Sequence, residues 1–364
     1  MSLGKGSYGA VSLRDGKAVK TFAKLSHLIQ EYTALQYLHN CKYIVHSRGV
    51  DFEALELHME LYDRSLRKWI EEGPELKRRP NINEIMNIVH DVLMGLVELH
   101  DRSLAHGDLK PGNILIRNNP LKAVLGDCGF VSIAKYAKVD RTAPIYRDPV
   151  VNHDSSHDMF SFGICFLELL GDTRIVRQAS YDELKSVVNE KVHNQEYKKI
   201  LFNLLNEDKD RRLTARNLLF KLFGEDPPRW SKPVVNCSDH SNHSNNFNHS
   251  NHSNERLGNT MSEHERNYVR KLVKDTGHEF EINRSRKGYG ALLAYIDNNK
   301  ISSNDYRINT GVVLMILSSL FGKSGFREQE VYELCERKYS YNQIYMVLNR
   351  ILSDSTFLNI LLGP

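Results

Sequence analysis

The first residues of the chain carry a glycine pattern that suits phosphate binding. Residues 4–11 read Gly-Lys-Gly-Ser-Tyr-Gly-Ala-Val. The pattern consists of three glycines and a valine: Gly4, Gly6, Gly9 and Val11. Glycines let the backbone approach a phosphate closely and leave its N–H groups free to bind the anion. In dinucleotide-binding folds the same spacing lies between a strand and a helix. Here a strand and an Asp15-Gly16 turn follow, which favours a β-hairpin that covers phosphates.

A lysine and a glutamate follow at positions that could hold phosphates in place. Lys20 lies on the strand expected after the glycine pattern, and Glu31 lies eleven residues later on a helix expected over 25–38. A buried lysine needs an anionic partner to stay charged and oriented, and Glu31 supplies one. For either residue alone, a solvated surface charge is the favoured interpretation. The prediction that Lys20 and Glu31 hold phosphates therefore depends on their place in an ordered set with the motifs that follow.

Two further motifs complete an ordered set. Residues 106–115 read His-Gly-Asp-Leu-Lys-Pro-Gly-Asn-Ile-Leu, and residues 126–130 read Gly-Asp-Cys-Gly-Phe. With the glycine pattern, the lysine and the glutamate, they resemble the signature of eukaryotic-type serine/threonine protein kinases over residue 1 to about residue 224. The resemblance implies an α+β, two-lobed protein kinase fold that uses ATP and Mg²⁺ to phosphorylate protein hydroxyls. The compact body also resembles the small kinases of large DNA viruses, although no single motif carries that second likeness.

The resemblance assigns a role to each residue of these motifs. It implies that Asp108 is the catalytic base that accepts the substrate hydroxyl proton, and that Lys110 lies beside the transferred phosphoryl group. Asn113 and Asp127 would hold Mg²⁺ ions, hard cations that suit oxygen ligands. Lys20 would bind the α- and β-phosphates of ATP.

Further positions match the family outside these motifs. Met59 falls at the gatekeeper position, and Glu60 and Leu61 fall at the hinge that meets adenine. Asp158 resembles the structural aspartate at the start of a large-lobe helix, and Arg212 resembles an arginine near the end of that lobe. The Asp-Leu-Lys-Pro sequence that begins at residue 108 resembles serine/threonine kinases, since tyrosine kinases carry Ala or Arg at the lysine position.

Two departures from the family pattern concern regulation. Gly107 replaces the arginine that normally meets a phosphate on the activation loop, so switching by loop phosphorylation loses its main electrostatic partner. We therefore predict constitutive or tail-controlled activity. Cys128 replaces the phenylalanine of the second motif, and we interpret it as a small buried apolar filler rather than a reactive thiol.

Other departures concern peptide docking. Val150 replaces a glutamate that usually pairs with Arg212, and Asp148 is the candidate substitute. Ala143 replaces a threonine that usually supports the catalytic aspartate, unless Thr142 takes its place. These changes motivate an alternative hypothesis, a pseudokinase scaffold that presents the C-terminal domain to a partner. Retention of every phosphate and metal residue argues against that alternative.

The elements expected around these residues change in type along the chain. Strands come first, including a pair near 44–50 and 54–60, and helical periodicity follows over 83–100, 157–170, 181–205 and 214–222. Strands followed by helices indicate an α+β layout with two segregated lobes. We predict a kinase N-lobe over 1–62, a kinase C-lobe over 63–230, a low-complexity linker over 231–256 and a helical domain of unknown role over 257–364.

The linker is rich in Asn, His and Ser and has almost no aliphatic residues. Such a segment cannot offset its ordering entropy by burial, so we interpret it as a flexible spacer. Its four histidines could bind a transition metal, but no Cys or carboxylate cluster would complete the site.

The last predicted domain contains an apolar helix over 311–321 and a helix–turn–helix-like pair over 327–338 and 341–352. An all-helical docking domain is favoured over a winged-helix or other DNA-binding module. The nearly balanced charge of this region supports nucleic-acid binding poorly.

Composition limits the partners and the compartment. Lys and Arg number 49 against 45 Asp and Glu, an excess that does not demand nucleic acid or an acidic membrane as partner. The 5 cysteines form no CxxC pair, which indicates a reducing compartment. The apolar run 312–321 is far shorter than the roughly 20 residues that span a membrane. We expect an intracellular, cytoplasmic protein with protein substrates. The basic triplet 77–79 leaves a nuclear location open, although a solvated loop is favoured.

Overall fold

The computed structural model describes most of residues 2–229 and parts of the C-terminal region. The described residues are 2–5, 9–75, 80–133, 144–149, 154–171, 174–229, 306–321, 329, 331, 333, 339–354, 356 and 357. Residues Met1–Trp230 form one compact unit, and Ser231–Gly363 form a second. The predicted linker with its four histidines, the basic triplet 77–79 and most of the predicted helix 327–338 lie outside the described residues.

The first unit begins with a five-stranded antiparallel sheet. Its strands are β1 (Ser2–Lys5), β2 (Gly9–Arg14), β3 (Lys17–Phe22), β4 (Ser47–Asp51) and β5 (Glu56–Met59). They lie in the order β1-β2-β3-β5-β4. Asp15 and Gly16 join β2 to β3 with positive φ angles of 48° and 71°, as a two-residue hairpin turn of this kind requires.

Helix α1 (Leu25–Tyr37) packs against β3, β4 and β5. Its buried apolar side chains recur at helical spacing: Leu28, Ile29, Tyr32 and Leu35. The same helix buries Glu31, a charged residue, completely. A buried carboxylate is costly unless it is paired, so its position on α1 already indicates a cation nearby.

Two smaller sets of strands follow. The first is a three-stranded sheet in the order β6-β8-β9, with β6 (Arg64–Ser65), β8 (Ile114–Asn118) and β9 (Leu121–Leu125). In the second, β7 (Leu104–Ala105) pairs with β10 (Ser132–Ile133). Short 3₁₀ turns flank the β8–β9 hairpin, η1 (Pro111–Asn113) directly before it and η2 (Cys128–Phe130) shortly after it. The hairpin therefore positions both of the sequence motifs.

Helices form the remainder of the first unit. They are α2 (Leu66–Glu75), α3 (Ile82–His100), α4 (Ser155–Gly171), α5 (Tyr181–Lys191), α6 (Gln195–Leu204) and α7 (Ala215–Phe223). Helix α4 buries Phe160, Phe162 and Phe166 fully, so it forms the centre of this lobe. Two more 3₁₀ turns are η4 (Pro144–Tyr146) and η5 (Lys209–Arg211).

The prediction of one helical stretch over 181–205 is wrong in one respect. Helix α5 ends at Lys191, and α6 begins at Gln195. Asn194 causes the break, because its side chain accepts hydrogen bonds from the backbone N–H groups of Glu196 and Tyr197 and caps the new helix.

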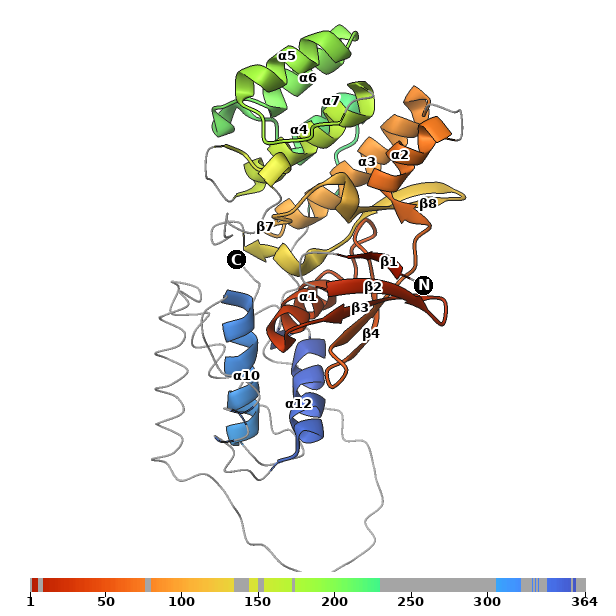
Figure 1. Cartoon of the computed structure of the whole chain (residues 1–364). Helices are drawn as coiled ribbons and strands as arrows, with labels where there is room; N and C mark the ends of the chain where they lie inside the picture. The colour runs from red at the N-terminus through yellow and green to blue at the C-terminus, as the bar shows by residue number, and fades with distance from the viewer. Residues whose placement is uncertain are drawn as a thin grey trace, which may run out of the picture. The chain divides into compact units, whose positions relative to one another are not determined.

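Figure 1 shows the strands β1 to β4 gathered with α1, and the helices α2 to α7 gathered in a second group. The predicted α+β layout with a sheet-containing lobe and a helical lobe is confirmed. The segment 60–63 connects them, between β5 and β6.

The second unit contains α10 (Tyr306–Phe321) and α12 (Tyr341–Ser353), which contact each other. Ser340 and Gln343 form a capping box that starts α12 where the sequence predicts a helix. None of the helices in the described residues combines the length and the apolar character that a membrane crossing requires.

Candidate active site

Lys20 stands between two carboxylates. Its Nζ lies 2.6 Å from Glu31 Oε2 and 2.7 Å from Asp127 Oδ1. The three residues come from β3, from α1 and from the segment after β9, and Lys20 is only 2% exposed. Tertiary packing thus brings together three charged residues that are far apart in the sequence.

The charges of this cluster follow from its burial and its pairing. Burial alone would lower the pKa of Lys20, but the charges of Glu31 and Asp127 outweigh it and raise that pKa. Burial raises the pKa of Glu31 to about 7, an effect that the ion pair with Lys20 opposes. Burial also disfavours ionised Asp127, yet Lys20 holds the Asp127 pKa below its usual range. Lys20 is therefore a permanent cation beside an ionised Asp127.

The catalytic segment orients Asp108 from two sides. Lys110 Nζ lies 2.5 Å from Asp108 Oδ2, and Asn113 Nδ2 donates to the same oxygen at 3.0 Å. Asn113 Nδ2 also donates to the Asp108 carbonyl at 2.8 Å, which closes the turn that leads into η1. Asp108 is 1% exposed. A carboxylate held in this way keeps one orientation, as a general base requires.

The ligand set fits Mg²⁺ chemically. Both hydrogen bonds of the Asn113 side chain use its nitrogen, so its Oδ1 oxygen is the atom suited to a metal ion. Asp127 contributes a carboxylate that is 16% exposed. Mg²⁺ usually takes one or two carboxylates together with substrate phosphates and water, so these two oxygen ligands are sufficient.

Asp158 positions the backbone of the catalytic segment. It lies at the start of α4, fully buried, and accepts hydrogen bonds from the backbone N–H groups of His106 at 2.8 Å and Gly107 at 3.0 Å. His100 Nε2 lies 3.0 Å from the same carboxylate. Burial raises the pKa of Asp158, but its bonds to His100 and the backbone outweigh that and lower it. An ionised carboxylate thus ties the segment to the lobe's central helix.

His106 links the two motifs to each other. Its Nδ1 accepts the Asp108 N–H at 3.3 Å, so its Nε2 carries the proton and donates to the Gly126 carbonyl at 3.0 Å. The residue is fully buried. Sequence reasoning assigned it no role, although it opens the motif that contains Asp108.

Gly107 has a backbone conformation that suits glycine. Its φ angle is +77°, and a Cβ at this position would lie 3.0 Å from the Phe130 carbonyl oxygen. The departure at Gly107 thus removes a charged side chain and also relieves a left-handed backbone position.

Cys128 is fully buried, and burial raises its pKa well above the usual value. The η2 turn that begins at Cys128 packs against α1. These observations agree with its interpretation as an apolar filler, since a reactive cysteine needs a lowered pKa and access to solvent.

The structure contains the substitute ion pair expected between Asp148 and Arg212. Arg212 Nη1 lies 2.5 Å from Asp148 Oδ2. Tyr181 donates to the other Asp148 oxygen at 2.6 Å, and the Arg212 guanidinium lies 5.0 Å from the centre of the Phe160 ring. Val150, Ala143 and Thr142 lie outside the described residues.

The glycine pattern is described in part. Gly4 lies on β1 opposite Val11 of β2, and Val11 in turn lies opposite Lys20 of β3. A Cβ on Gly9 would lie 2.2 Å from the Thr21 carbonyl oxygen, so only glycine fits there. Gly6 lies outside the described residues.

The hinge residues lie directly after β5. Met59 ends the strand, 7% exposed, and Glu60 and Leu61 follow in the connection between the lobes. The Glu60 side chain is engaged by Arg117, whose Nη2 lies 3.0 Å from Glu60 Oε1. Sequence reasoning missed Arg117, because nothing in its spacing connects it to the hinge.

A second network that sequence reasoning missed holds the segment around η4. Glu168 of α4 is 1% exposed; it lies 2.7 Å from Arg67 and accepts the Tyr146 hydroxyl at 3.1 Å. Ser161 donates to the Tyr146 carbonyl at 2.7 Å. This part of the segment is therefore fixed to α4 by both side chain and backbone.

Comparison with known proteins decides the family. Residues 1–223 match the family model described as protein kinase domain. The chain belongs to the protein kinase family. The kinase is 27% identical over 190 residues to a Wee1-like protein kinase of Arabidopsis thaliana, covering 48% of this chain and 36% of that protein. It is 32% identical over 180 residues to the serine/threonine-protein kinase SBK1 of Danio rerio, covering 43% and 44%.

The human serine/threonine-protein kinase WNK2 is 30% identical over 153 residues, covering 37% of this kinase and 7% of that protein. The kinase thus spans less than half the length of these curated relatives. The resemblance to protein kinases is confirmed for the residues that carry the motifs.

Proposed function

We propose that this kinase transfers the γ-phosphate of ATP to serine and threonine hydroxyls of protein substrates, with Mg²⁺ as the metal. The observation that carries the proposal is the assembly of two clusters from separate elements: Lys20 with Glu31 and Asp127, and Asp108 with Lys110 and Asn113. Two of the relatives are named as serine/threonine-protein kinases.

Each cluster performs a different part of this reaction. Lys20, held between two carboxylates, fixes the phosphates of the nucleotide by charge. Asp108 accepts the proton of the substrate hydroxyl, and Lys110, 2.5 Å from it, places a positive charge beside the transferred group. Asn113 Oδ1 and the Asp127 carboxylate would hold Mg²⁺, which neutralises phosphate charge when bound.

Regulation follows from the residue that is replaced. Gly107 offers no side chain to a phosphate on the activation loop, and the segment around Tyr146 and Asp148 is already tied to the lobe through Glu168 and Arg212. We therefore propose that basal activity does not require loop phosphorylation. The activity is then constitutive or controlled by the C-terminal domain.

The proposed setting is intracellular, either cytoplasmic or nuclear, and the free thiols of the described cysteines Cys41, Cys128 and Cys165 agree with a reducing compartment. The partners proposed are protein substrates. The pseudokinase alternative is disfavoured. The described residues expected to bind phosphate and metal, Lys20, Asn113 and Asp127, keep the chemical types that this binding requires, and they form the contacts described above.

The test is transfer of radiolabelled phosphate from MgATP to the kinase itself and to generic acidic and basic proteins. Wild type is compared with Asp108→Asn and with Asp182→Asn, a control whose side chain is 94% exposed. We expect transfer in wild type and in the control, and a loss of at least about a hundredfold in Asp108→Asn with MgATP binding retained. Equal transfer by Asp108→Asn, or none by wild type despite MgATP binding, would contradict the proposal.

A further inference from the structure

Basic side chains from both lobes surround the Glu60 carboxylate in the connection between the lobes. Glu60 lies 3.0 Å from Arg117 of β8, 3.6 Å from Arg48 of β4 and 4.0 Å from His46. The Tyr62 hydroxyl donates to the other Glu60 oxygen at 3.4 Å. Elements of both lobes therefore meet at the Glu60 carboxylate.

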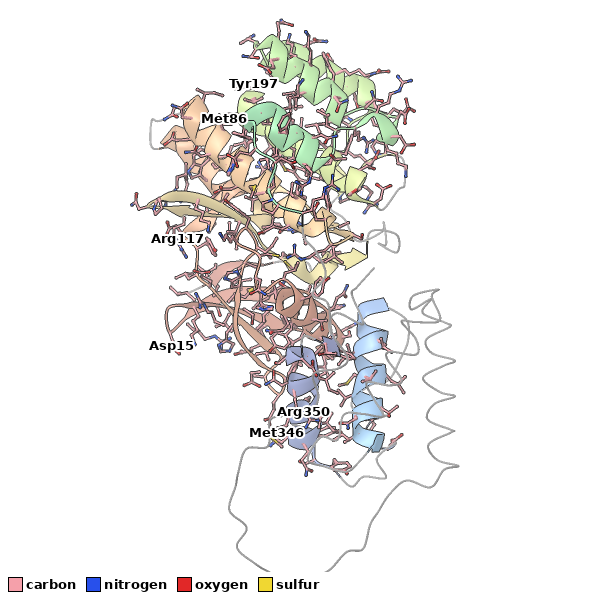
Figure 2. The ribbon with its side chains drawn as sticks, turned by 180° about the vertical axis from the view of Figure 1, so that it is seen from behind. Asp15, Met86, Arg117, Tyr197, Met346 and Arg350 are labelled. Carbon is pink, nitrogen blue, oxygen red and sulfur yellow. The ribbon has the colours of Figure 1, made fainter. Side chains whose placement is uncertain are left out.

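Arg117 contacts three successive residues of this connection. Besides Glu60, its Nη2 donates to the Leu61 carbonyl at 3.4 Å, and its guanidinium lies 4.8 Å from the centre of the Tyr62 ring. A planar guanidinium can combine an ion pair, a carbonyl bond and an aromatic contact, which an ammonium group does less well. Figure 2 shows Arg117 where the strands of the C-lobe face the N-lobe.

The backbone of β8 extends this attachment by one residue. Asp63 N–H donates to the Ile116 carbonyl at 3.0 Å, and the Asn118 N–H donates to the Asp63 carboxylate at 2.7 Å. Residues 60–63 are thus fixed to β8 at four consecutive positions. The hinge cannot shift along β8 without breaking several of these contacts.

The same hairpin carries the metal residues. β8 begins directly after Asn113, and its partner β9 ends two residues before Asp127. Ile114 and Leu125 lie opposite each other at that end, whereas Arg117 lies near the turn. A nucleotide that reaches from the hinge to the metal therefore spans a distance that the β8–β9 hairpin sets.

We propose that Arg117 is a positioning residue for the nucleotide: it fixes residues 60–62 to the hairpin that carries Asn113 and Asp127. The inference rests on the proposed function, because it assumes that MgATP binds between these residues. Burial raises the pKa of Glu60, but Arg117 outweighs that and lowers it, so the carboxylate is ionised at neutral pH.

The expected effect is moderate, because Arg117 is 39% exposed and Glu60 is 21% exposed. We expect Arg117→Ala to raise the Kd and the KM for MgATP about threefold to tenfold, with kcat at saturating ATP within about twofold of wild type. Arg117→Lys should have Kd and KM values for MgATP between those of wild type and those of Arg117→Ala. Arg64→Ala is the matched control, because Arg64 lies on β6 beside β8 and pairs with Glu72.

A double-mutant cycle tests the route of the effect. If Arg117 acts through Glu60, Arg117→Ala should weaken MgATP binding less in a Glu60→Gln background than in wild type. Binding is measured by titration calorimetry on the full chain, and Tm is measured for every variant. Arg64→Ala should leave Kd and KM at wild-type values.

Each other outcome is decisive. An unchanged Kd for MgATP in Arg117→Ala would overturn the inference. If Tm and kcat fall while that Kd is unchanged, the role of Arg117 is structural only. If Arg117→Ala does not fold, the Kd for MgATP of Arg117→Lys and of Glu60→Gln is compared with that of wild type instead, and an unchanged Kd in both variants would overturn the inference. If the wild-type protein binds no MgATP, the proposed function is overturned as well. If wild type and Arg117→Ala bind MgATP with the same Kd, only the positioning role is overturned.

Discussion

Arg212 holds Asp148 at 2.5 Å across 64 residues of sequence, and each of the two side chains is 1% exposed. The pair joins the segment after η4 to the loop that follows η5. Tyr181 of α5 contacts the same carboxylate, so three parts of the C-lobe meet there. The resemblance to kinases implies a glutamate at position 150 for this attachment; this chain has Val150 there, and Asp148, two residues earlier, makes the ion pair.

Removing the Asp148 carboxylate should be strongly destabilising. Asp148→Ala leaves the Arg212 guanidinium buried without its counter-charge, which typically costs about 3–5 kcal/mol. Urea denaturation measures the free energy of unfolding. Asp182→Ala, which removes an exposed carboxylate, should change it by less than about 0.5 kcal/mol. A similar small effect for both variants would contradict the role of the buried pair.

The glycine pattern should tolerate alanine unequally. Gly9→Ala places a methyl group 2.2 Å from the Thr21 carbonyl, so the β2–β3 pairing must shift, at a cost of about 1–3 kcal/mol. Gly4→Ala meets no described atom within 4 Å and should leave stability near wild type. Thermal unfolding of both variants checks the difference. Equal Tm values would show that the strand adapts to a side chain at Gly9.

Restoring a side chain at Gly107 should destabilise the catalytic segment. A non-glycine residue at φ of +77° costs about 1–2 kcal/mol, and the new Cβ would also press on the Phe130 carbonyl. Gly107→Ala and Gly107→Arg should both unfold at lower urea concentration than wild type. Gly112→Ala, whose Cβ would meet its nearest neighbour at 4.0 Å, is the control. A stabilised Gly107→Arg would contradict this expectation.

A histidine between two carboxylates makes stability depend on pH. Burial alone lowers the pKa of His90, but hydrogen bonds with Glu225 and Asp91, each at 3.1 Å, outweigh burial and raise it. A pKa raised on folding adds stability below the unfolded value of about 6.5, and that stability disappears as pH rises through the folded value.

At pH values below about 6.5, Glu225→Gln should therefore lower the Tm by about 1–2 °C, and at high pH it should leave the Tm unchanged. The expected effect is small because Glu225 is largely exposed. Thermal unfolding across this pH range measures the difference between the two proteins. A Tm difference that is constant with pH would show that the bond does not depend on the charge of His90.

Much of the fold and of the motif chemistry could be predicted from the sequence. Phosphate and metal binding requires particular residue types at short, fixed spacings, as in the segment 106–115, and helical periodicity located α1, α3, α4 and α7 to within a few residues. Asn194 shows the limit of periodicity, because one side-chain cap divides a continuous helical pattern into α5 and α6.

The supporting contacts could not be predicted in this way. Arg117 with Glu60, and Arg67 with Glu168, are pairs separated by 57 and 101 residues. No local pattern links such residues, since only the packed lobes bring them together. Asp148 could be predicted because Val150, at the expected partner position of Arg212, carries no charge, and Asp148 is an acidic residue two positions away.

Burial of Cys41, Cys128 and Cys165 has a practical consequence. Burial also raises the pKa of each of these thiols, to about 12 at Cys41, so alkylating reagents react with them only after the surrounding structure opens. The three cysteines lie after α1, in η2 and in α4. Alkylation rates resolved by peptide mass spectrometry would therefore time the opening of three separate parts of the kinase at its native cysteines.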